Sequence, residues 1–336
     1  MLLLSVCLAV SAPSSVVAQE TVMLVGVGSS LPGPLYEVWS QEFMKQNSRI
    51  RLRYLSHGTG EGMRSILSGS GDFGAGDAPI SERDLKTADV PILELPSVLI
   101  GIVVVYNLPG VREAINLSGP VLADIYLGKI KNWADPEIAK LNPRVKLPSL
   151  SILVVHRTDG KGSSYIFSDF LSKSSWEFQN RVGVNISPKW PAGVAAARSE
   201  DLITKVKVTR GAVGYTEMKW AMNSGVSAAR IRNPAGDFVI ASAGTIAAAA
   251  TASLSKMTDD FRVSLTDAPG KQSYPISSFT WIYVHEKSKD PARAQALVAF
   301  LTWAFSDGQS VATREGYAAL PSGVLSKVRA KVAIIR

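Results

Sequence analysis

Sulfur and imidazole ligands are scarce in this sequence of 336 residues. It contains one cysteine, Cys7, and three histidines, His57, His156 and His285, which are not spaced as the ligands of a metal site are. Because Cys7 lies in the first eighteen residues, a chain without that segment would form no disulfide and offer no sulfur ligand. We therefore expect no metal and no other cofactor, and we interpret the histidines as structural.

The apolar stretch near the start, residues 2–10, is too short to cross a bilayer, which needs about 20 residues. It belongs to an uncharged segment, residues 1–18, that ends on small residues before Gln19. Despite the missing positive charge at its beginning, this pattern predicts a signal peptide cleaved after Ala18, and hence an exported protein. A lipid anchor at Cys7 is the less favoured reading, because Val6 is bulkier than the residue that a lipoprotein cleavage site prefers.

Basic residues are numerous but not concentrated. The net charge is +8 and the sequence pI is about 9.5, which is compatible with nucleic acid, an anionic membrane surface or small anions as partners. No basic block and no basic stripe with interleaved aromatic residues occurs, so we expect no nucleic-acid partner. The simplest interpretation of the net charge is a general positive electrostatic field that speeds the encounter with a small anion.

The composition predicts a large folded core. With 46% hydrophobic and 19% charged residues, a chain of this length is expected to form two lobes rather than one. Apolar runs rich in β-forming residues alternate with amphipathic helical patterns, which favours α/β lobes with largely parallel sheets. We predict strands at 21–27, 50–56, 98–107, 151–157 and 279–285, and helices at 33–46, 61–68, 121–129, from Pro136, at 163–174 and at 290–305.

Three loops rich in glycine, serine and threonine each lie between a predicted strand and a predicted helix, at residues 26–33, 56–62 and 157–164. Each would place backbone N–H groups and hydroxyls at a helix N-terminus, where the helix dipole favours an anion. One such loop is common in proteins without any ligand. Three of them, one beginning with Arg157, point to an anion site.

A further segment, residues 74–79, places Asp77 just after what we interpret as a short apolar turn. Taken alone, Asp77 would be an ordinary turn or helix cap. Residues 69–74 match a dinucleotide-binding spacing, but the segment follows a helix pattern and does not open one. A P-loop and a nucleophile elbow are both missing from the sequence, so enzymatic chemistry has little local support.

Five segments together resemble the periplasmic phosphate-binding proteins of phosphate ABC transporters. They are GVGSSLPGPLYEVW, FGAGDAPIS, ADIYLGKIKNWADPEIAKLNP, HRTDGKGSS and GAVGYTE, which occur in the family's order over roughly residues 21–330. The resemblance implies a two-lobed class II periplasmic-binding-protein fold with two crossover strands and a ligand cleft that closes like a hinge. The expected parts are a first lobe from residues 19–98 and 277–336, and a second lobe from 99–276.

The resemblance also implies a phosphate site. Ser30, the N–H of Leu31 and Thr59 match ligands of the first lobe, and Asp77 matches the family's acceptor carboxylate. In the second lobe Arg157 matches the only charged donor, Gly162 and Ser163 match a helix N-terminus, and Asp159 matches the residue that pairs with the arginine.

This sequence departs from the family pattern at three of these positions. Leu31 replaces an aromatic residue, which matters little for a backbone donor, and Thr59 replaces a serine but keeps the hydroxyl. Lys161 stands where the family has a hydroxyl ligand, which puts part of the pocket in question. Because the lysine side chain is too long for a cavity sized for one phosphate, we expect its ammonium to reach toward the mouth of the cleft.

The expected function follows from the resemblance: the protein captures inorganic phosphate in the periplasm and, as a monomer, delivers it to the permease of an ABC transporter. Phosphate near neutral pH carries a proton and sulfate does not, so a buried carboxylate at Asp77 would accept a hydrogen bond from phosphate and repel sulfate. The alternatives are a secreted phosphatase-like or phosphate-ester-binding protein of the same fold, and a sensor or adhesion role.

Overall fold

Residues 21–158 and 160–336 are described by the computed structural model of the chain, so the predicted signal peptide, Cys7 and Asp159 lie outside the described residues. The main sheet has nine strands, of which eight follow the order β2-β1-β3-β12-β4-β8-β6-β7, while β9 pairs with β4. These strands are β1 (Val22–Gly28), β2 (Ile50–Ser56), β3 (Phe73–Gly76), β4 (Ile92–Tyr106), β6 (Leu153–Arg157), β7 (Val194–Ala196), β8 (Ala212–Glu217), β9 (Ser227–Ala228) and β12 (Ser277–His285).

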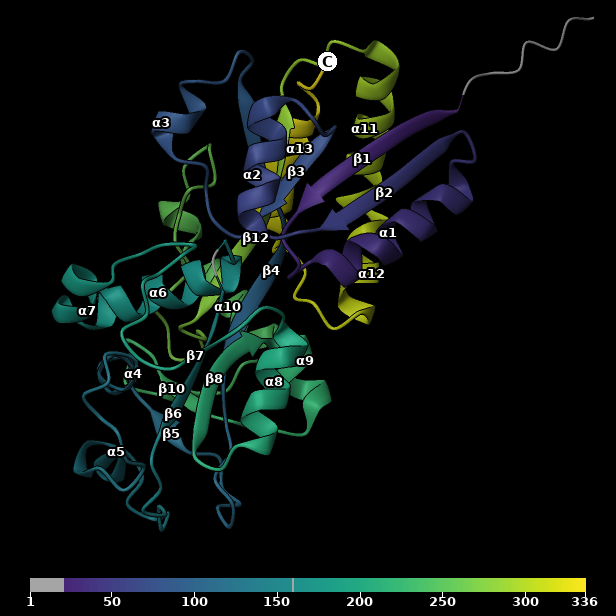
Figure 1. The fold of residues 1–336 in the computed structure, drawn as a ribbon. Coiled ribbons are helices and arrows are strands. Elements are labelled where there is room, and N and C mark those ends of the chain that lie inside the picture. Colours follow the sequence, from purple (N-terminus) through teal and green to yellow (C-terminus); the bar gives the residue numbers. More distant parts are fainter. Residues whose placement is uncertain (1–20, 159) are drawn as a thin grey trace, which may run out of the picture.

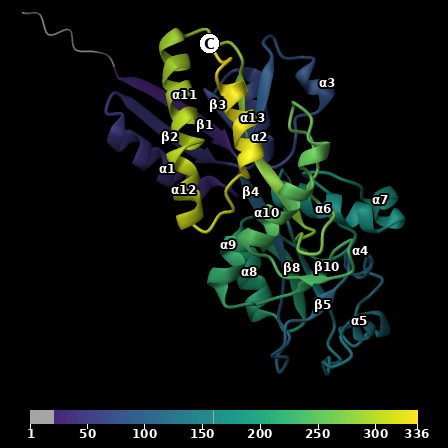
Figure 2. The same ribbon diagram turned by 180° about the vertical axis from the view of Figure 1, so that it is seen from behind.

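The molecule has two lobes, which lie above and below one another in Figure 1. We use "first lobe" for β1, β2 and β3 with the helices around them, namely α1 (Gly33–Gln46), α2 (Thr59–Ser68), α11 (Pro291–Ala304), α12 (Asp307–Arg314) and α13 (Ser322–Val332). Seen from behind, α11, α12 and α13 cover one face of this lobe, whereas α2 lies on the face seen in Figure 1 (Figures 1 and 2). Segments from the N-terminal and the C-terminal parts of the chain thus belong to the same lobe.

The "second lobe" contains β6, β7 and β8 and the helices packed around them. These helices are α4 (Gly119–Tyr126), α5 (Pro136–Leu141), α6 (Gly162–Ser174), α7 (Trp176–Arg181), α8 (Ser199–Val208) and α9 (Met218–Ser224). A small sheet with the order β11-β10-β5 completes it, from β5 (Asn116–Leu117), β10 (Arg230–Arg232) and β11 (Phe238–Val239). The short α3 (Glu82–Leu85) follows β3, and α10 (Ala243–Ala252) packs against β4 and β12, where the lobes meet.

Two long strands, β4 and β12, connect the lobes. The N-terminal part of β4 pairs with β12 as far as Gly101, and from Ile102 onward β4 pairs with β8 of the second lobe. The predicted apolar strand at 98–107 is thus the buried second half of a strand that begins at Ile92. The predicted lobe limit at residues 98 and 99 falls within β4, near this change of partner, and it stays a prediction.

Local signals in the sequence set the helix ends. Asp135 caps α5, with its side chain accepting a hydrogen bond of 2.9 Å from the Glu137 N–H, and Asp290 caps α11 in the same way. Proline follows each of these aspartates, at the first helical position, where its missing N–H costs nothing. The predicted ranges 33–46 and 50–56 coincide with α1 and β2.

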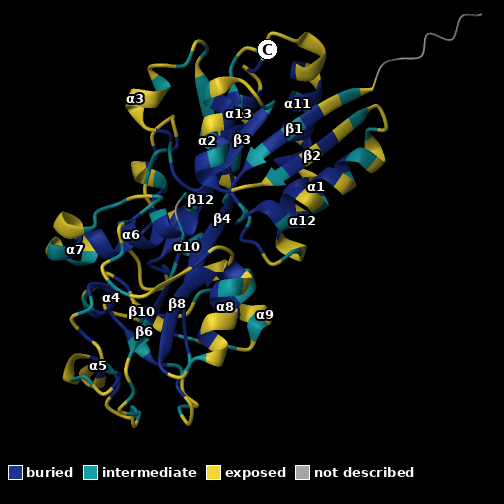
Figure 3. Ribbon diagram, viewed as in Figure 1, coloured by how far each residue is buried: buried dark blue, intermediate teal, exposed yellow. Residues whose placement is uncertain are grey.

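The buried residues form a continuous core through both lobes (Figure 3). On α1 the predicted apolar face is buried at Leu35, Trp39 and Phe43, and on α10 two alanines of the run at 247–250 are buried. Within residues 21–158 and 160–336, the helices are all too short or too polar to cross a membrane.

Candidate functional site

A buried carboxylate, Asp77, lies at the centre of the candidate site. Its side chain has no exposed surface, and it accepts hydrogen bonds from three hydroxyls of the first lobe and the connecting strand. Ser29 donates to Oδ2, Thr59 donates to the same oxygen over 3.1 Å, and Thr280 of β12 donates to Oδ1. The carboxylate is therefore held by hydroxyls from three segments that the fold brings together.

The sheet explains this convergence. β1 and β3 are parallel neighbours, so Ser29 and Asp77, which follow their carboxyl ends, lie at the same edge. Our prediction of a turn before Asp77 was wrong, because residues 73–76 pair with both β1 and β12 and so form a buried strand. Residues 69–74 follow α2 and enter β3, so they do not open a helix, as the sequence pattern indicated.

Burial alters the ionisation of this carboxylate. The removal of water raises the pKa of Asp77 to about 6, while the hydrogen bonds from Ser29, Thr280 and Thr59 act in the opposite direction. Near neutral pH the group is therefore mainly ionised but close to its titration range. Oδ2 already accepts two hydroxyls and Oδ1 accepts one, so Oδ1 keeps capacity for a further donor.

The second lobe contributes the N-terminus of α6, which begins at Gly162. A Cβ atom at Gly162 would overlap the Asp77 carboxylate, so only glycine permits this close approach between the lobes. Ser163 and Ser164, the next two residues, are buried. The first N–H groups of a helix have no partner within it, so α6 directs free donors and a positive dipole end toward this point.

Arg157 lies at the end of β6 and is only 3% exposed. Its guanidinium donates to Ser199 Oγ over 2.8 Å and to the carbonyl of Ala197 over 3.1 Å, and it lies 3.8 Å from Glu217 Oε1. Arg157 is therefore a buried cation of the second lobe and not a surface residue. The predicted pairing with Asp159 lies outside the described residues.

Two buried donors lack a partner. Arg157 Nε and Ser163 Oγ have no hydrogen bond to any of the described residues, although both are removed from water. Leaving buried polar groups unpaired is costly, and such groups in a folded protein call for an explanation. A bound anion between Asp77 and the start of α6 would supply acceptors to both.

The two serines of the first loop, Ser29 and Ser30, differ in burial and in hydrogen bonding. Ser30 is partly exposed and is not among the residues that bond Asp77, whereas Ser29, which the sequence analysis missed, is buried and donates to that carboxylate. The N–H of Leu31 donates to Ser29 Oγ over 3.0 Å. Direct contact of Ser30 and Leu31 with an anion stays a prediction.

Lys161 is the N-cap residue of α6 and is partly buried. Its Nζ lies 3.4 Å from the place where a Cβ of Gly58 would be, so the ammonium reaches across to the loop of the first lobe. Burial, together with the charge of Arg157, lowers the pKa of Lys161. The ammonium thus lies between the lobes rather than on an outer surface.

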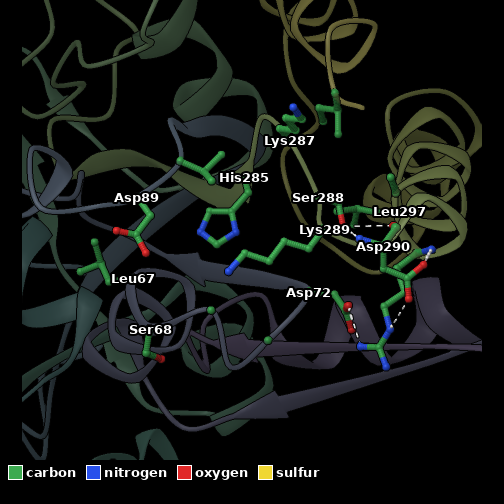
Figure 4. A pocket seen from close by; sticks show the side chains of 16 residues that line it. Leu67, Ser68, Asp72, Asp89, His285, Lys287, Ser288, Lys289, Asp290 and Leu297 are labelled. Carbon is green, nitrogen blue, oxygen red and sulfur yellow. Dashed lines mark hydrogen bonds and ion pairs between the residues drawn. The ribbon is translucent and has the colours of Figure 1, made fainter.

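No metal site accompanies this arrangement: among residues 21–158 and 160–336 no group of three or more His, Cys, Asp or Glu side chains could hold a metal ion. A cavity of about 440 Å³ lies elsewhere, at the outer end of the first lobe near His285, Lys289 and Asp290 (Figure 4). The predicted site residues do not line it. We therefore take the Asp77 region, not this cavity, as the candidate site.

Comparison with known proteins agrees with the fold and shows the family. The family profile described as the PBP superfamily domain matches residues 14–308. The phosphate-binding protein PstS of Pasteurella multocida is 37% identical over 309 residues, covering 92% of this chain and 89% of the relative. The protein of the same name from Methanocaldococcus jannaschii is 34% identical over 337 residues, covering 94% of this chain and 86% of the relative.

Among solved structures, the phosphate-binding protein of Stenotrophomonas maltophilia has the same fold. It matches with a TM-score of 0.71 and 18% identity, over 92% of this chain and 94% of that protein. These matches agree with the periplasmic-binding-protein fold that the resemblance implied. The chain therefore belongs to the PBP superfamily and, within it, to the family of PstS phosphate-binding proteins.

Proposed function

We propose that this protein binds inorganic phosphate between its two lobes and delivers it, outside the cytoplasm, to the permease of an ABC transporter. The observation that carries the proposal is the meeting of Asp77 with the N-terminus of α6, beside buried donors of Arg157 and Ser163 that have no hydrogen-bond partner among the described residues. The names of the PstS relatives state phosphate binding for those proteins, and they support the same ligand here.

The chemistry of the site suits a tetrahedral oxyanion that carries a proton. Backbone N–H groups of α6, the Arg157 guanidinium and the Ser163 hydroxyl can donate to the unprotonated oxygens. The Asp77 carboxylate can only accept while it is ionised, so it matches the O–H of phosphate. The site thus offers several hydrogen-bond donors and one acceptor, the Asp77 carboxylate. An anion that carries one proton requires this combination.

Binding and release would require the lobes to separate. The Gly60 N–H lies 3.4 Å from the carbonyl of Gly160, so the start of α2 in the first lobe touches the loop that precedes α6 in the second lobe. We place the hinge in β4 and β12 and the lobes at residues 19–98 with 277–336 and at 99–276. We also propose that the protein acts as a monomer, is exported through a signal peptide in residues 1–18 and has no catalytic activity.

Titration calorimetry of the mature chain with phosphate and sulfate tests this proposal. We expect phosphate to bind at least about a thousandfold more tightly than sulfate at pH 7.5, since sulfate leaves the Asp77 carboxylate without a donor. Turnover of a chromogenic phosphomonoester by the same preparation would instead favour the phosphatase-like alternative. Absence of phosphate binding would refute the proposal.

Lys161→Ser tests the role of the residue at which this chain departs from its family. We expect phosphate affinity to stay within a fewfold, because the backbone donors of α6 do not depend on the side chain. The association rate and its sensitivity to salt should fall, since a positive charge on the entry path is lost. Stopped-flow tryptophan fluorescence measures both, with Lys205→Ser, a lysine on the exposed side of α8, as the matched control.

Stopped-flow fluorescence on the unchanged protein and on Lys161→Ser also tests whether the site binds a larger phosphorylated ligand. If glycerol phosphate binds more tightly than phosphate to the unchanged protein, and Lys161→Ser abolishes that preference, then the assignment to inorganic phosphate is wrong.

A further inference from the structure

A chain of buried hydrogen bonds extends from Arg157 away from the anion site. Arg157 Nη1 donates to Ser199 Oγ over 2.8 Å, and Ser199 Oγ donates to Glu217 Oε1 over 2.9 Å. The other carboxylate oxygen of Glu217 accepts from Thr216 Oγ1 over 2.7 Å. The Arg157 and Glu217 side chains are 2% and 6% exposed, so this chain is shielded from water.

The fold makes this arrangement rigid. β6 and β8 are parallel neighbours, so Arg157 and Glu217, their last residues, end at the same edge of the sheet. Ser199 is the first residue of α8, which packs against both strands. All three residues therefore belong to regular elements, and Nη1 and Nη2 of the guanidinium are both held, whereas its Nε has no partner among the described residues.

We propose that Glu217 is a positioning residue of the anion site, which orients the Arg157 guanidinium through Ser199 and offsets its charge. This inference rests on the proposed function. A planar guanidinium has five N–H donors in a fixed geometry, so fixing Nη1 on Ser199 and Nη2 on the carbonyl of Ala197 determines where Nε points. A preoriented donor loses less side-chain entropy on binding than a mobile one.

Glu217 also affects the acceptor on the other side of the site. Its negative charge adds to burial in raising the pKa of Asp77. Removal of the Glu217 charge should therefore lower the pH at which Asp77 becomes protonated. Among the described residues, the other titratable groups near Asp77 or Glu217 are the ion pair of Lys219 and Glu315, tyrosines whose raised pKa keeps them neutral between pH 5 and 8, and the cations of the second lobe: Tyr36, Tyr54, Tyr215, Tyr283, Tyr317, Arg157 and Lys161.

Three variants separate hydrogen bonding from charge. Ser199→Ala and Glu217→Ala each break the chain, and each should weaken phosphate binding about tenfold. The double variant should be about as weak as either single one, because both changes remove the same support for Arg157. Glu217→Gln keeps an acceptor for Ser199, so its affinity at pH 7.5 should stay within a fewfold of the unchanged protein.

The pH profile of phosphate binding, measured by calorimetry from pH 5 to 8, supplies a readout that a merely structural role would not move. In Glu217→Gln the loss of binding on acidification should shift to lower pH by about 0.3 to 0.5 unit. Phosphate's own ionisation is common to all variants and cancels in the comparison. Glu94→Gln is the matched control, because this buried glutamate pairs with Arg262 away from the site, and it should show no shift.

The outcomes distinguish the inference from the function on which it rests. If the unchanged protein does not bind phosphate, the proposed function fails and the role of Glu217 fails with it. If it binds phosphate but the losses of Ser199→Ala and Glu217→Ala multiply to about a hundredfold, or if Glu217→Gln shows no pH shift, then only the inference is wrong. Should the Glu217 variants fail to fold, unchanged phosphate affinity in Ser199→Ala would still overturn it.

Discussion

Arg157→Ala should weaken phosphate binding by about ten- to a hundredfold, more than the removal of any single hydroxyl at the site. A hydrogen bond to a charged group contributes about 1.5–3 kcal/mol, whereas a neutral one contributes about 1 kcal/mol. Arg157 is buried, and its Nε has no partner among the described residues. The Nε–H group can therefore donate to an anion without a competing acceptor among those residues. Calorimetry on Arg157→Ala, Ser30→Ala, Thr59→Ala and Ser163→Ala would rank these contributions.

The same substitution leaves Glu217 without the cation 3.8 Å away, so part of any loss could come from a destabilised fold. The double variant Arg157→Ala/Glu217→Gln removes the unpaired charge and controls for this effect. We expect it to regain thermal stability but not phosphate affinity. Equal losses for the arginine and the three hydroxyl positions Ser30, Thr59 and Ser163 would contradict a central role for Arg157.

Much of the fold could be predicted because its signals are local. The apolar face of α1, the Asp-Pro pairs before α5 and α11, and the alternation of strands and helices all act over a few residues. β3 was missed because four residues with two glycines look like a turn, and only its neighbours β1 and β12 make it a strand. Pairing between distant segments is not visible in local sequence.

The site was predictable to the extent that glycine-rich loops precede helices. Thr59 and Gly162 both lie against Asp77, and Arg157 is buried in the second lobe, but the binding of an anion by these residues stays a prediction. Thr280 could not be found in this way, because it lies within a continuous strand, and its contact with Asp77 depends on the antiparallel register of β12 beside β3. Glu217 lies in a segment that the resemblance included, but nothing local marks it as a partner of Arg157.

Asp77→Asn should also change how the stability of the ligand-free protein depends on pH. The folded-state pKa of Asp77, about 6, is above the usual value of about 3.9 for an unfolded chain, so folding favours the protonated form. The contribution of this group to stability is present below pH 4 and is lost as the pH rises through 6, by up to about 3 kcal/mol. Unfolding by urea at pH 4 and pH 7.5 should show this loss in the unchanged protein and not in Asp77→Asn.

The larger effect of Asp77→Asn concerns selectivity, and we expect the preference for phosphate over sulfate to fall by on the order of a hundredfold or more. Phosphate suits either orientation of the amide, because the amide oxygen can accept from the phosphate O–H and the NH₂ can donate to an unprotonated phosphate oxygen, so phosphate affinity should fall far less than the preference does. Two hydroxyls, of Ser29 and Thr59, donate to Oδ2. They favour the amide oxygen at that position, which places the NH₂ where Oδ1 stands and lets it donate to an unprotonated sulfate oxygen.

Calorimetry with both anions on Asp77→Asn, with Asp72→Asn as a control on the outer side of the first lobe, would measure this change. The control should keep the preference, because Asp72 bonds the Val25 N–H and Arg293 and does not reach the anion site. Sulfate binding should appear in Asp77→Asn at pH 7.5, where the unchanged carboxylate is ionised and repels a second anion. If sulfate still fails to bind while phosphate binds, the discrimination must come from the donors of α6 and Arg157, and the role assigned to Asp77 is wrong.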